Sequence, residues 1–345
     1  MHSSSSAPSS TAPSSSLSKI SISSLFQYTV LAALAYVLAG APLSSLLSSP
    51  SSTPNNNTAR AGAAQNSHNG REMENLVIPE KGLECGGHQL KGVHLMSRDP
   101  LVVYIEGFLG EGEGHEVVSL SEPHFTPSTV WTSGRESLNP SIRQSEKALL
   151  PRSQTVKCIE ERARTFQGWR PFTFIEKLWA QRYNQGGHYT YHYDWSTATQ
   201  SSGRVSSFMV YVAGECRGGG THFPRLEKPA GNEWCRFIEC DVEGVYGNGT
   251  STASTTNSSN GIGSAGGAGG KEDLTQGVIF KPIPGNAVYW ENMRNDGSGY
   301  AESWHAGLPV LEGSKIGLNI WSWLAEGYVP PVKQESVGED SVDGK

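Results

Sequence analysis

The segment with the clearest chemical potential is RYNQGGHYTYHYDW, residues 182–195, which contains His192 and Asp194 two positions apart. In a β-strand, residues i and i+2 point to the same face of the sheet, so both side chains can reach one cation. The best candidate for a third ligand is His305, in the segment ESWHAGLPVLEGSK. Two histidines and one carboxylate on one face of an octahedron are typical of non-heme Fe(II) sites with three open positions.

Lys315 makes this pattern more informative. A His-x-Asp pair alone is more often structural or at the surface than metal-binding. Lys315 follows His305 by ten residues, at the start of the apolar segment KIGLNIW, which is predicted to be a strand. Burying an unpaired ammonium group is costly, so a lysine directed into a sheet core implies an anionic partner. A dicarboxylate cosubstrate would supply that partner.

The elements that must position these side chains are mostly short strands bounded by Gly, Pro or Asn. Residues 153–166 are the exception and predict a helix, because Val156, Ile159 and Ala163 recur at helical spacing. Many short strands around one helical region predict a mainly β fold, a sandwich or jelly roll with flanking helices on one side. The predicted strands cover residues 100–108, 177–184, 189–193, 206–212, 277–282, 286–290 and 317–323.

An ordered series of motifs over about residues 99–325 resembles the prolyl 4-hydroxylase catalytic-subunit family of 2-oxoglutarate- and Fe(II)-dependent dioxygenases. The resemblance implies the double-stranded β-helix, or jelly roll, of that family, which agrees with the predicted strands. The motifs are PLVVYIEGFL, RYNQGGHYTYHYDW, RVSSFMVYV, GGGTHFP, PIPGNAVYWEN and HAGLPVLEGSKIGLNIW.

The resemblance extends to individual functional positions. It implies that His192, Asp194 and His305 are the iron ligands, and that Lys315 pairs with the distal carboxylate of 2-oxoglutarate. These four residues are therefore the expected catalytic set.

Three further residues match positions around the cosubstrate. Tyr183 and Thr221 match residues whose hydroxyls reach 2-oxoglutarate, and Trp321 matches an aromatic residue that lines the pocket. Without the surrounding motifs, Tyr183 and Trp321 are equally consistent with core packing, and Thr221 with the end of a turn.

The resemblance implies a procollagen-proline 4-dioxygenase-like enzyme. Such an enzyme hydroxylates peptidyl proline in a protein or peptide substrate while it decarboxylates 2-oxoglutarate to succinate and CO2, using Fe(II), O2 and L-ascorbate. Two alternatives stay open: the same chemistry on another side chain or a small molecule, and a non-catalytic, membrane-tethered binding module. A zinc hydrolase is disfavoured because the sequence has no HExxH motif.

The chain departs from the family pattern in three ways. Ile316 follows Lys315 where the family often has Trp, a change expected to alter packing rather than chemistry. A low-complexity insert at residues 247–270 lengthens the spacing between Asp194 and His305, which loop-closure entropy tolerates because it grows only logarithmically. The peptide-substrate-binding and tandem-repeat regions of collagen hydroxylase subunits are not visible in the polar N-terminal part.

Composition supports one catalytic domain with polar additions. Charged residues are 17% and hydrophobic residues 36% of the 345, below the averages of about 25% and about 45–50%. The net charge of −6 argues against a nucleic-acid partner, which needs a basic face. The predicted organisation is a disordered N-terminus at 1–24, a membrane anchor at 25–43, a Ser/Asn-rich linker at 44–75, a dioxygenase domain at 76–330 and an acidic tail at 331–345.

Residues 25–43 form a 19-residue segment without a charge, close to the roughly 20 residues that span a bilayer. We expect a single-pass transmembrane helix, with a cleaved signal peptide and a buried helix as alternatives. Lys19 precedes the segment and the next basic residue, Arg60, lies far beyond it, which favours a cytosolic N-terminus. The expected location is thus the endoplasmic reticulum membrane, with the catalytic domain in the lumen.

The cysteines and glycosylation sequons agree with a lumenal domain. None of the five cysteines forms a CxxC pair, so a thiolate zinc site is disfavoured. Cys216, Cys235 and Cys240 are close enough in sequence to supply one disulfide. Asn-x-Ser/Thr sequons begin at Asn56, Asn248 and Asn257, two of them inside the insert, where chance matches are common.

Overall fold

Two long antiparallel strands form the centre of the fold in this computed structural model, which describes residues 74–132, 135–195, 202–247 and 272–329. Strand β11 (Ser202–Gly218) pairs with β16 (Val310–Ala325) from Ser202–Ala325 to Gly218–Val310. Side chains alternate along both strands, so that apolar residues face one side and a mixed set of polar and aromatic residues faces the other. The polar side is the one that carries the chemistry described below.

The larger sheet is built outward from this central pair. Its strand order is β1-β2-β14-β11-β16-β9-β7-β3, with β8 also paired to β16. Every pairing in it is antiparallel. The other strands of this sheet are β1 (Gly92–Arg98), β2 (Leu101–Glu106), β3 (Thr126–Pro127), β7 (Glu146–Leu149), β8 (Thr173–Ile175), β9 (Trp179–Tyr183) and β14 (Ala287–Glu291).

A smaller sheet completes the two-sheet architecture. Its order is β13-β12-β15-β10-β6. These strands are β6 (Arg143–Gln144), β10 (His188–His192), β12 (Thr221–Phe223), β13 (Val278–Phe280) and β15 (His305–Gly307). A separate hairpin pairs β4 (Val130–Thr132) with β5 (Arg135–Ser137). Two antiparallel sheets with helices on one side confirm the predicted mainly β jelly-roll fold.

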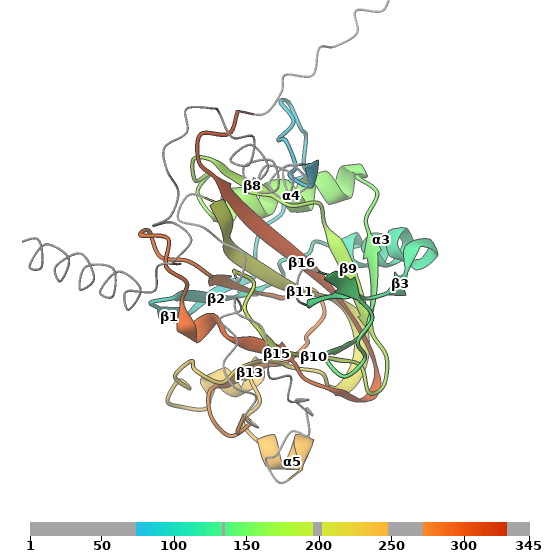
Figure 1. Ribbon diagram of the computed structural model, residues 1–345, viewed down its shortest axis with the longest axis vertical. Helices are drawn as coiled ribbons and strands as arrows, with labels where there is room; N and C mark the ends of the chain where they lie inside the picture. Colours follow the sequence, from blue (N-terminus) through green and yellow to red (C-terminus); the bar gives the residue numbers. More distant parts are fainter. Residues whose placement is uncertain (1–73, 133–134, 196–201, 248–271, 330–345) are drawn as a thin grey trace, which may run out of the picture. The chain divides into compact units, whose positions relative to one another are not determined.

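Two helices cover the outer face of the larger sheet, on the side of β16 away from β10 and β15 (Figure 1). They are α3 (Glu113–Ser121) and α4 (Gln154–Phe166). Helix α4 begins after Ser153, whose hydroxyl accepts a hydrogen bond from the Val156 amide over 3.3 Å. The short helical segments are η2 (Glu122–His124), η3 (Glu233–Arg236), α5 (Val242–Tyr246) and η4 (Ala301–Ser303).

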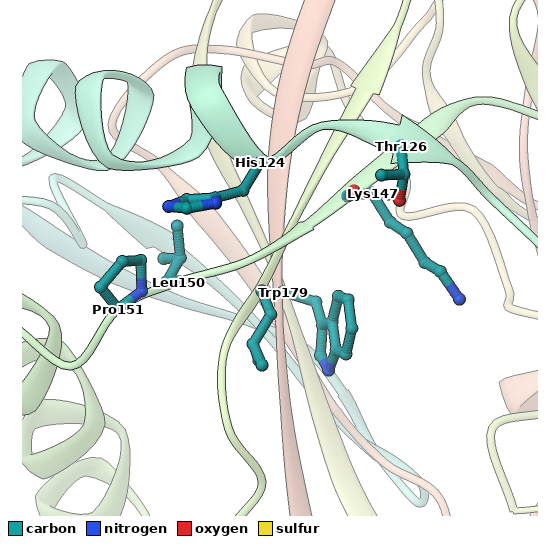
Figure 2. Close-up of a pocket in the computed structure, with 7 residues that line it drawn as sticks. His124, Thr126, Lys147, Leu150, Pro151 and Trp179 are labelled. Atoms are coloured by element: carbon teal, nitrogen blue, oxygen red, sulfur yellow. Dashed lines mark hydrogen bonds between the residues drawn. The ribbon is translucent and has the colours of Figure 1, made fainter.

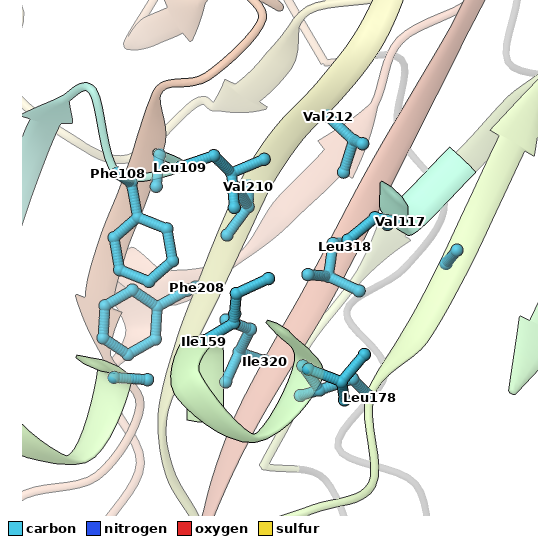
Figure 3. Packing of buried hydrophobic residues seen from close by; sticks show 14 of the residues in the cluster. Phe108, Leu109, Val117, Ile159, Leu178, Phe208, Val210, Val212, Leu318 and Ile320 are labelled. Carbon is cyan, nitrogen blue, oxygen red and sulfur yellow. The ribbon is translucent and has the colours of Figure 1, made fainter. Parts of the chain in front are cut away.

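The main hydrophobic core lies between these helices and the sheet. Figure 3 shows Val117 of α3 and Ile159 of α4 near the β11 and β16 side chains that form this core. Every one of these residues is less than 10% exposed, so their burial fixes which face of β11 and β16 points outward. The labelled members of the cluster are Phe108, Leu109, Val117, Ile159, Leu178, Phe208, Val210, Val212, Leu318 and Ile320.

A second, more aromatic core packs residues of both sheets together. Tyr104 and Trp290 of the larger sheet share this cluster with Phe223 and Phe280 of the smaller one. Phe223 lies edge-on to Trp290, with ring centroids 5.2 Å apart. This cluster borders the metal-ligating residues described below, so it also forms the apolar surroundings of the site.

The predicted elements are largely confirmed, although the two longest strands exceed their predictions. The predicted helix at residues 153–166 is α4, and the predicted strand at 189–193 is β10. Strand β16 begins at Val310, so Lys315 lies within the strand rather than at its start. Pairing with β11 continues through Gly313 and Ser314, where the apolar alternation is absent.

Two disulfides tie the described residues together. Cys235 and Cys240 form the local disulfide that the sequence predicted within the 216–240 cluster, and Cys216 remains a thiol. The second disulfide, Cys85–Cys158, joins the N-terminal segment to α4 and was not predicted.

The predicted membrane anchor at 25–43, the polar segments 1–24 and 44–73, most of the insert and the acidic tail lie outside the described residues. Within the part of the chain that is described, no helix is long and apolar enough to cross a bilayer.

Candidate metal and cosubstrate site

The two histidines of the predicted triad are brought together by strand pairing. His192, the last residue of β10, is the direct partner of His305, the first residue of β15. Their ring centroids lie 4.4 Å apart. Asp194 follows His192 by two residues, and its Oδ1 and Oδ2 atoms lie 3.8 Å from His192 Nε2 and 4.0 Å from His305 Nε2.

Hydrogen bonds fix which ring nitrogen of each histidine faces Asp194. His192 Nδ1 lies 2.8 Å from the Thr190 carbonyl oxygen, and His305 Nδ1 lies 2.8 Å from that of Ser303. A carbonyl oxygen only accepts, so each Nδ1 carries the proton and each Nε2 presents a lone pair. Both lone pairs are therefore directed to the position that a metal ligand requires.

The electrostatics of His192 and Asp194 favour their metal-binding protonation states. Burial, followed by repulsion from His305, holds the pKa of His192 well below its usual value, so the ring is neutral at pH 7. Burial alone would raise the pKa of Asp194, but His305, His192 and Arg204 hold that pKa below its usual value. A neutral His192 imidazole and an ionised Asp194 carboxylate result.

This donor set fits Fe(II). One ligand atom from each of His192, Asp194 and His305 lies within 4.8 Å of the other two. Asp194 and His305 are less than 10% exposed, so the centre is largely shielded from water. Two imidazole nitrogens and one carboxylate oxygen on one side of a cation are the ligands of the facial triad that the sequence predicted.

Lys315 lies on the same face of β16 as Gly317, Asn319 and Trp321, because residues two apart share a face. Its side chain is 4% exposed, and its ammonium donates to the Gly219 carbonyl oxygen. Among the described residues no carboxylate forms an ion pair with it. Burial lowers the pKa of Lys315 to about 8, which still leaves it mostly charged at pH 7.

A buried ammonium group without a counter-ion fits an anionic ligand, since pairing would offset its desolvation. The carboxylate of 2-oxoglutarate is such an anion. The adjacent Ile316 turns to the opposite face and packs against the main core. Ile316 thus lies on the packing side of the strand, away from the Lys315 ammonium.

Tyr183 lies beside Lys315 on the neighbouring strand, whereas Thr221 lies on β12 of the smaller sheet. Tyr183 pairs with Lys315 across β9 and β16, and the Lys315 ammonium lies 4.9 Å from the centre of its ring. The Tyr183 hydroxyl donates to Gln181 over 2.7 Å, so it is engaged within its own strand. The Thr221 hydroxyl accepts from Tyr211 over 2.9 Å, which leaves its own proton for a ligand.

Trp321 connects the lysine-bearing strand to the metal triad. Its indole Nε1 donates to Asp194 Oδ2 over 3.1 Å, and the Arg204 guanidinium lies 3.8 Å from the centre of the ring. Arg204 also makes two hydrogen bonds to Glu176, of 2.7 and 3.0 Å. Trp321 is thus both a wall of the site and a hydrogen-bond donor to a predicted ligand.

Sequence reasoning missed an aromatic ring that stacks on His192. Tyr189 stacks on His192 with ring centroids 3.8 Å apart, and the Arg143 guanidinium lies 4.7 Å from the centre of the Tyr189 ring. Tyr189 stands three residues before His192, a spacing that does not share a face in a regular strand. The register shift between these two residues brings the rings together, and nothing in the sequence signals it.

Sequence reasoning also missed the polar residues behind Asp194. Ser207 donates to Asp194 Oδ2 over 2.7 Å, and Asn292 donates to Ser207 over 2.8 Å. Ser207 belongs to the predicted strand at 206–212, and Asn292 directly follows β14. Their proximity depends on the pairing of β11 with β14, which the sequence does not reveal.

A pocket of about 500 Å³ lies apart from these residues, near the edge of the larger sheet (Figure 2). None of the seven predicted site residues lines it. The pocket contains no acidic side chain and no thiol, so it does not offer a second metal site. Its lining consists of His124, Thr126, Lys147, Leu149, Leu150, Pro151 and Trp179.

Comparison with known proteins agrees with this geometry. Residues 178–323, which include all seven predicted site residues, match the 2OG-Fe(II) oxygenase superfamily. The chain is 25% identical to the human prolyl 4-hydroxylase subunit alpha-3 over 241 residues, 66% of this chain and 34% of that protein. It is 27% identical to prolyl 4-hydroxylase 5 of Arabidopsis thaliana over 283 residues, 76% of this chain and 83% of that protein.

Among solved structures, the chain is similar to a viral collagen prolyl hydroxylase from Paramecium Bursaria Chlorella virus-1 in a 2OG complex, with a TM-score of 0.42 and 21% identity. That match covers 64% of this chain and 95% of the viral protein. The chain spans about a third of the length of the human relative, which therefore contains much that has no counterpart in the matched region. The resemblance noted in the sequence is confirmed for residues 178–323.

Proposed function

We propose that this chain, whose residues 178–323 match the 2OG-Fe(II) oxygenases, is a 2-oxoglutarate-dependent dioxygenase that hydroxylates peptidyl proline. The observation that carries the proposal is the convergence of His192, Asp194 and His305 within 4.8 Å of one another. The same domain buries Lys315, for which the described residues provide no carboxylate partner. A metal triad alone is compatible with several chemistries. The buried ammonium adds the anion site that a 2-oxo dicarboxylate needs.

Each residue has a distinct part in this reaction. When bound at the triad, Fe(II) supplies the oxygen activation that hydroxylates a C–H bond while 2-oxoglutarate is converted to succinate and CO2. Lys315 binds the distal carboxylate of 2-oxoglutarate, and the Thr221 hydroxyl donates a hydrogen bond to it. The burial of Lys315 and His305 keeps water away from both ends of the cosubstrate.

Proline is the acceptor that the relatives favour, since those named above are prolyl 4-hydroxylases. Two half-buried aromatic rings support this choice. Tyr189 stacks on His192, and Trp321 hydrogen-bonds to Asp194, so each ring adjoins a metal ligand. These rings make the surroundings of the metal ligands more apolar, which suits a hydrocarbon ring as the acceptor.

Succinate release from purified protein tests the proposal. Proline-rich peptides should stimulate succinate formation only when Fe(II) is present, and mass spectrometry should find one added oxygen on proline. Succinate without modified peptide would shift the assignment to a small molecule or another side chain. No iron binding and no succinate would support the binding-module alternative.

We further propose that the domain works in the lumen of the endoplasmic reticulum, held by a single-pass anchor at residues 25–43. The disulfides Cys85–Cys158 and Cys235–Cys240 support an oxidising compartment. Ascorbate, which keeps iron reduced in this class of enzyme, completes the expected cofactor set. Carbonate extraction and protease protection of the full chain in microsomes test the anchor and its orientation.

A further inference from the structure

Three buried residues form a one-way hydrogen-bond chain behind Asp194. Trp290 Nε1 donates to Asn292 Oδ1 over 2.9 Å, and Asn292 Nδ2 donates to Ser207 Oγ over 2.8 Å. Ser207 Oγ then donates to Asp194 Oδ2 over 2.7 Å. Trp290 is 2% exposed, and Ser207 and Asn292 are fully buried, so water does not compete for these bonds.

Trp290 sets the direction of this hydrogen-bond chain. An indole N–H only donates, so the Asn292 oxygen must face Trp290 and its NH2 group must face Ser207. The Ser207 oxygen therefore accepts from Asn292, and its own proton is directed to Asp194. That proton requires an acceptor, and the Asp194 carboxylate is a strong one because it is ionised.

The hydrogen-bond chain ends on one oxygen of the Asp194 carboxylate. Asp194 Oδ2 accepts hydrogen bonds from both Ser207 and Trp321, whereas no hydrogen bond to Oδ1 is found among the described residues. Oδ1 lies 3.8 Å from His192 Nε2 and Oδ2 lies 4.0 Å from His305 Nε2, so the hydrogen bonds to Oδ2, rather than proximity to a histidine, distinguish the two oxygens. A carboxylate held in this way offers one oxygen to a cation, because using both would require it to give up two hydrogen bonds.

We propose that Ser207, Asn292 and Trp290 are positioning residues that restrict Asp194 to a single metal-binding oxygen. The inference rests on the proposed metal centre and extends it to residues that do not touch the metal. A second coordinating oxygen would take one of the three positions needed by cosubstrate and O2. The hydrogen-bond chain thereby both supports metal affinity and preserves the open coordination positions.

The anchoring of Asn292 supports this role. Its backbone N–H donates to the Val205 carbonyl oxygen over 2.8 Å, and its own carbonyl accepts from the Tyr300 amide over 2.9 Å. The amide is therefore fixed at both backbone ends before its side chain reaches Ser207. Trp290 also packs edge-on against His305, with ring centroids 4.9 Å apart, so the same residue adjoins a second ligand.

Cobalt(II) binding to metal-free protein tests the proposal without relying on turnover. Ser207→Ala should weaken Co(II) affinity by about 10–100-fold, the usual effect of losing an outer hydrogen-bond partner of a ligand. The visible absorption of the Co(II) protein should also change, because the released carboxylate can bind through both oxygens. Ser206→Ala is a matched control, since Ser206 is adjacent and equally buried but its hydroxyl donates to Gln167 on the helix side.

The outcomes separate the inference from the function on which it rests. If wild-type protein binds no Co(II), the metal centre itself is wrong. If wild-type protein binds Co(II) and Ser207→Ala binds it with the same affinity and spectrum, the positioning role is overturned. Equal losses in Ser206→Ala and Ser207→Ala would also overturn it, because they would indicate a general effect of stability.

Two more variants keep the test decisive if Ser207→Ala does not fold. Asn292→Ala leaves the Ser207 hydroxyl in place without its orienting donor, and should weaken Co(II) binding less than removal of the hydroxyl does. Ser207→Thr retains the hydroxyl and should bind Co(II) close to the wild-type affinity. A folded Asn292→Ala protein with unchanged affinity and spectrum would contradict the proposal.

Discussion

His192 and His305 are direct cross-strand partners, joined by the register of β10 and β15. Because each ring donates its Nδ1 proton to a backbone carbonyl two residues earlier, both Nε2 atoms are free to bind a cation. The site is therefore prepared by backbone geometry before any metal arrives. It also means that the smaller sheet, although it has only short strands, positions both histidines.

Removal of one ligand should abolish metal-dependent activity. His192→Ala is expected to weaken divalent metal binding by more than the roughly 10–100-fold that loss of an outer partner costs, and to stop 2-oxoglutarate decarboxylation. Metal titration and succinate release measure both effects. His222→Ala is a useful comparison, because His222 is also buried but bonds to Tyr191 and Gln276 instead. Full decarboxylation by His192→Ala would rule out the triad.

Removal of the buried ammonium should affect 2-oxoglutarate specifically. Lys315→Ala is expected to raise the KM for 2-oxoglutarate by at least about 30-fold, since truncating one member of a buried charge pair costs about 2–5 kcal/mol. Metal affinity should change little. Lys157→Ala serves as control, because Lys157 pairs with Glu80 on the far side of the main core. An unchanged KM in Lys315→Ala would refute the carboxylate role.

The same lysine predicts a pH dependence of cosubstrate binding. Burial lowers the pKa of Lys315 from 10.5 to about 8, so the empty site loses its charge as the pH rises through about 8. The KM for 2-oxoglutarate should then increase, approaching about tenfold per pH unit. Arginine stays charged over this range. Lys315→Arg protein that binds 2-oxoglutarate should therefore show a KM that does not change with pH. The charged fraction of Lys315 should fall from about 90% at pH 7 to about 10% at pH 9, so a wild-type KM that is constant over this range would contradict the prediction.

A rise in pH should weaken 2-oxoglutarate binding but increase the stability of the fold. The unfolded lysine keeps its proton up to about pH 10.5 while the folded one releases it near pH 8, so unfolding binds a proton in between. The free energy of unfolding contributed by Lys315 should therefore rise with pH across this window. Below pH 8 the cost of burying the charge is fully present, and 2-oxoglutarate should offset it. Denaturant titrations with and without 2-oxoglutarate at several pH values measure both effects.

The two disulfides should differ in their contribution to stability. Cys85–Cys158 closes 73 residues and Cys235–Cys240 closes 5, so chain entropy predicts about 4 and about 2 kcal/mol respectively. Urea unfolding of the double variants C85S/C158S and C235S/C240S measures each loss. An equal or smaller loss from the long-range pair would show that strain or residual structure dominates.

The insert should be dispensable for the fold. On either side of it, Tyr246 accepts a hydrogen bond from the Gly220 amide, and the Gln276 carbonyl accepts one from His222. Both flanks are therefore attached to β12 or to the residue just before it, and need no insert to hold them. Replacing residues 248–270 with a short Gly-Ser linker should leave the Tm and decarboxylation unchanged. An unfolded product would show that the insert is structural.

The sequence alone pointed to the three residues that the structure brings together, His192, Asp194 and His305. The two-residue spacing of His192 and Asp194 predicted a shared face. Lys315 was informative because a charged side chain in an apolar strand implies an anionic partner. These signals are local, so they survive without knowledge of which strands pair. The fold class followed in the same way from many short strands and one amphipathic helix.

What the sequence could not supply depends on strand pairing. Ser207 and Asn292 are 85 positions apart, and their contact follows only from the pairing of β11 with β14. Tyr189 reaches His192 because of an irregular register in β10, and Cys85 reaches Cys158 across 73 positions. Such contacts are set by tertiary packing, which local periodicity does not encode.

The most direct test supplies purified protein with Fe(II), 2-oxoglutarate, ascorbate, a proline-rich peptide and isotopically labelled O2. The proposed function predicts one labelled oxygen in the peptidyl proline and one in succinate, in equal amounts, with neither product in His192→Ala. Label in succinate alone would indicate a different acceptor. Unlabelled products, or equal labelling by His192→Ala, would contradict an oxygenase centred on His192, Asp194 and His305.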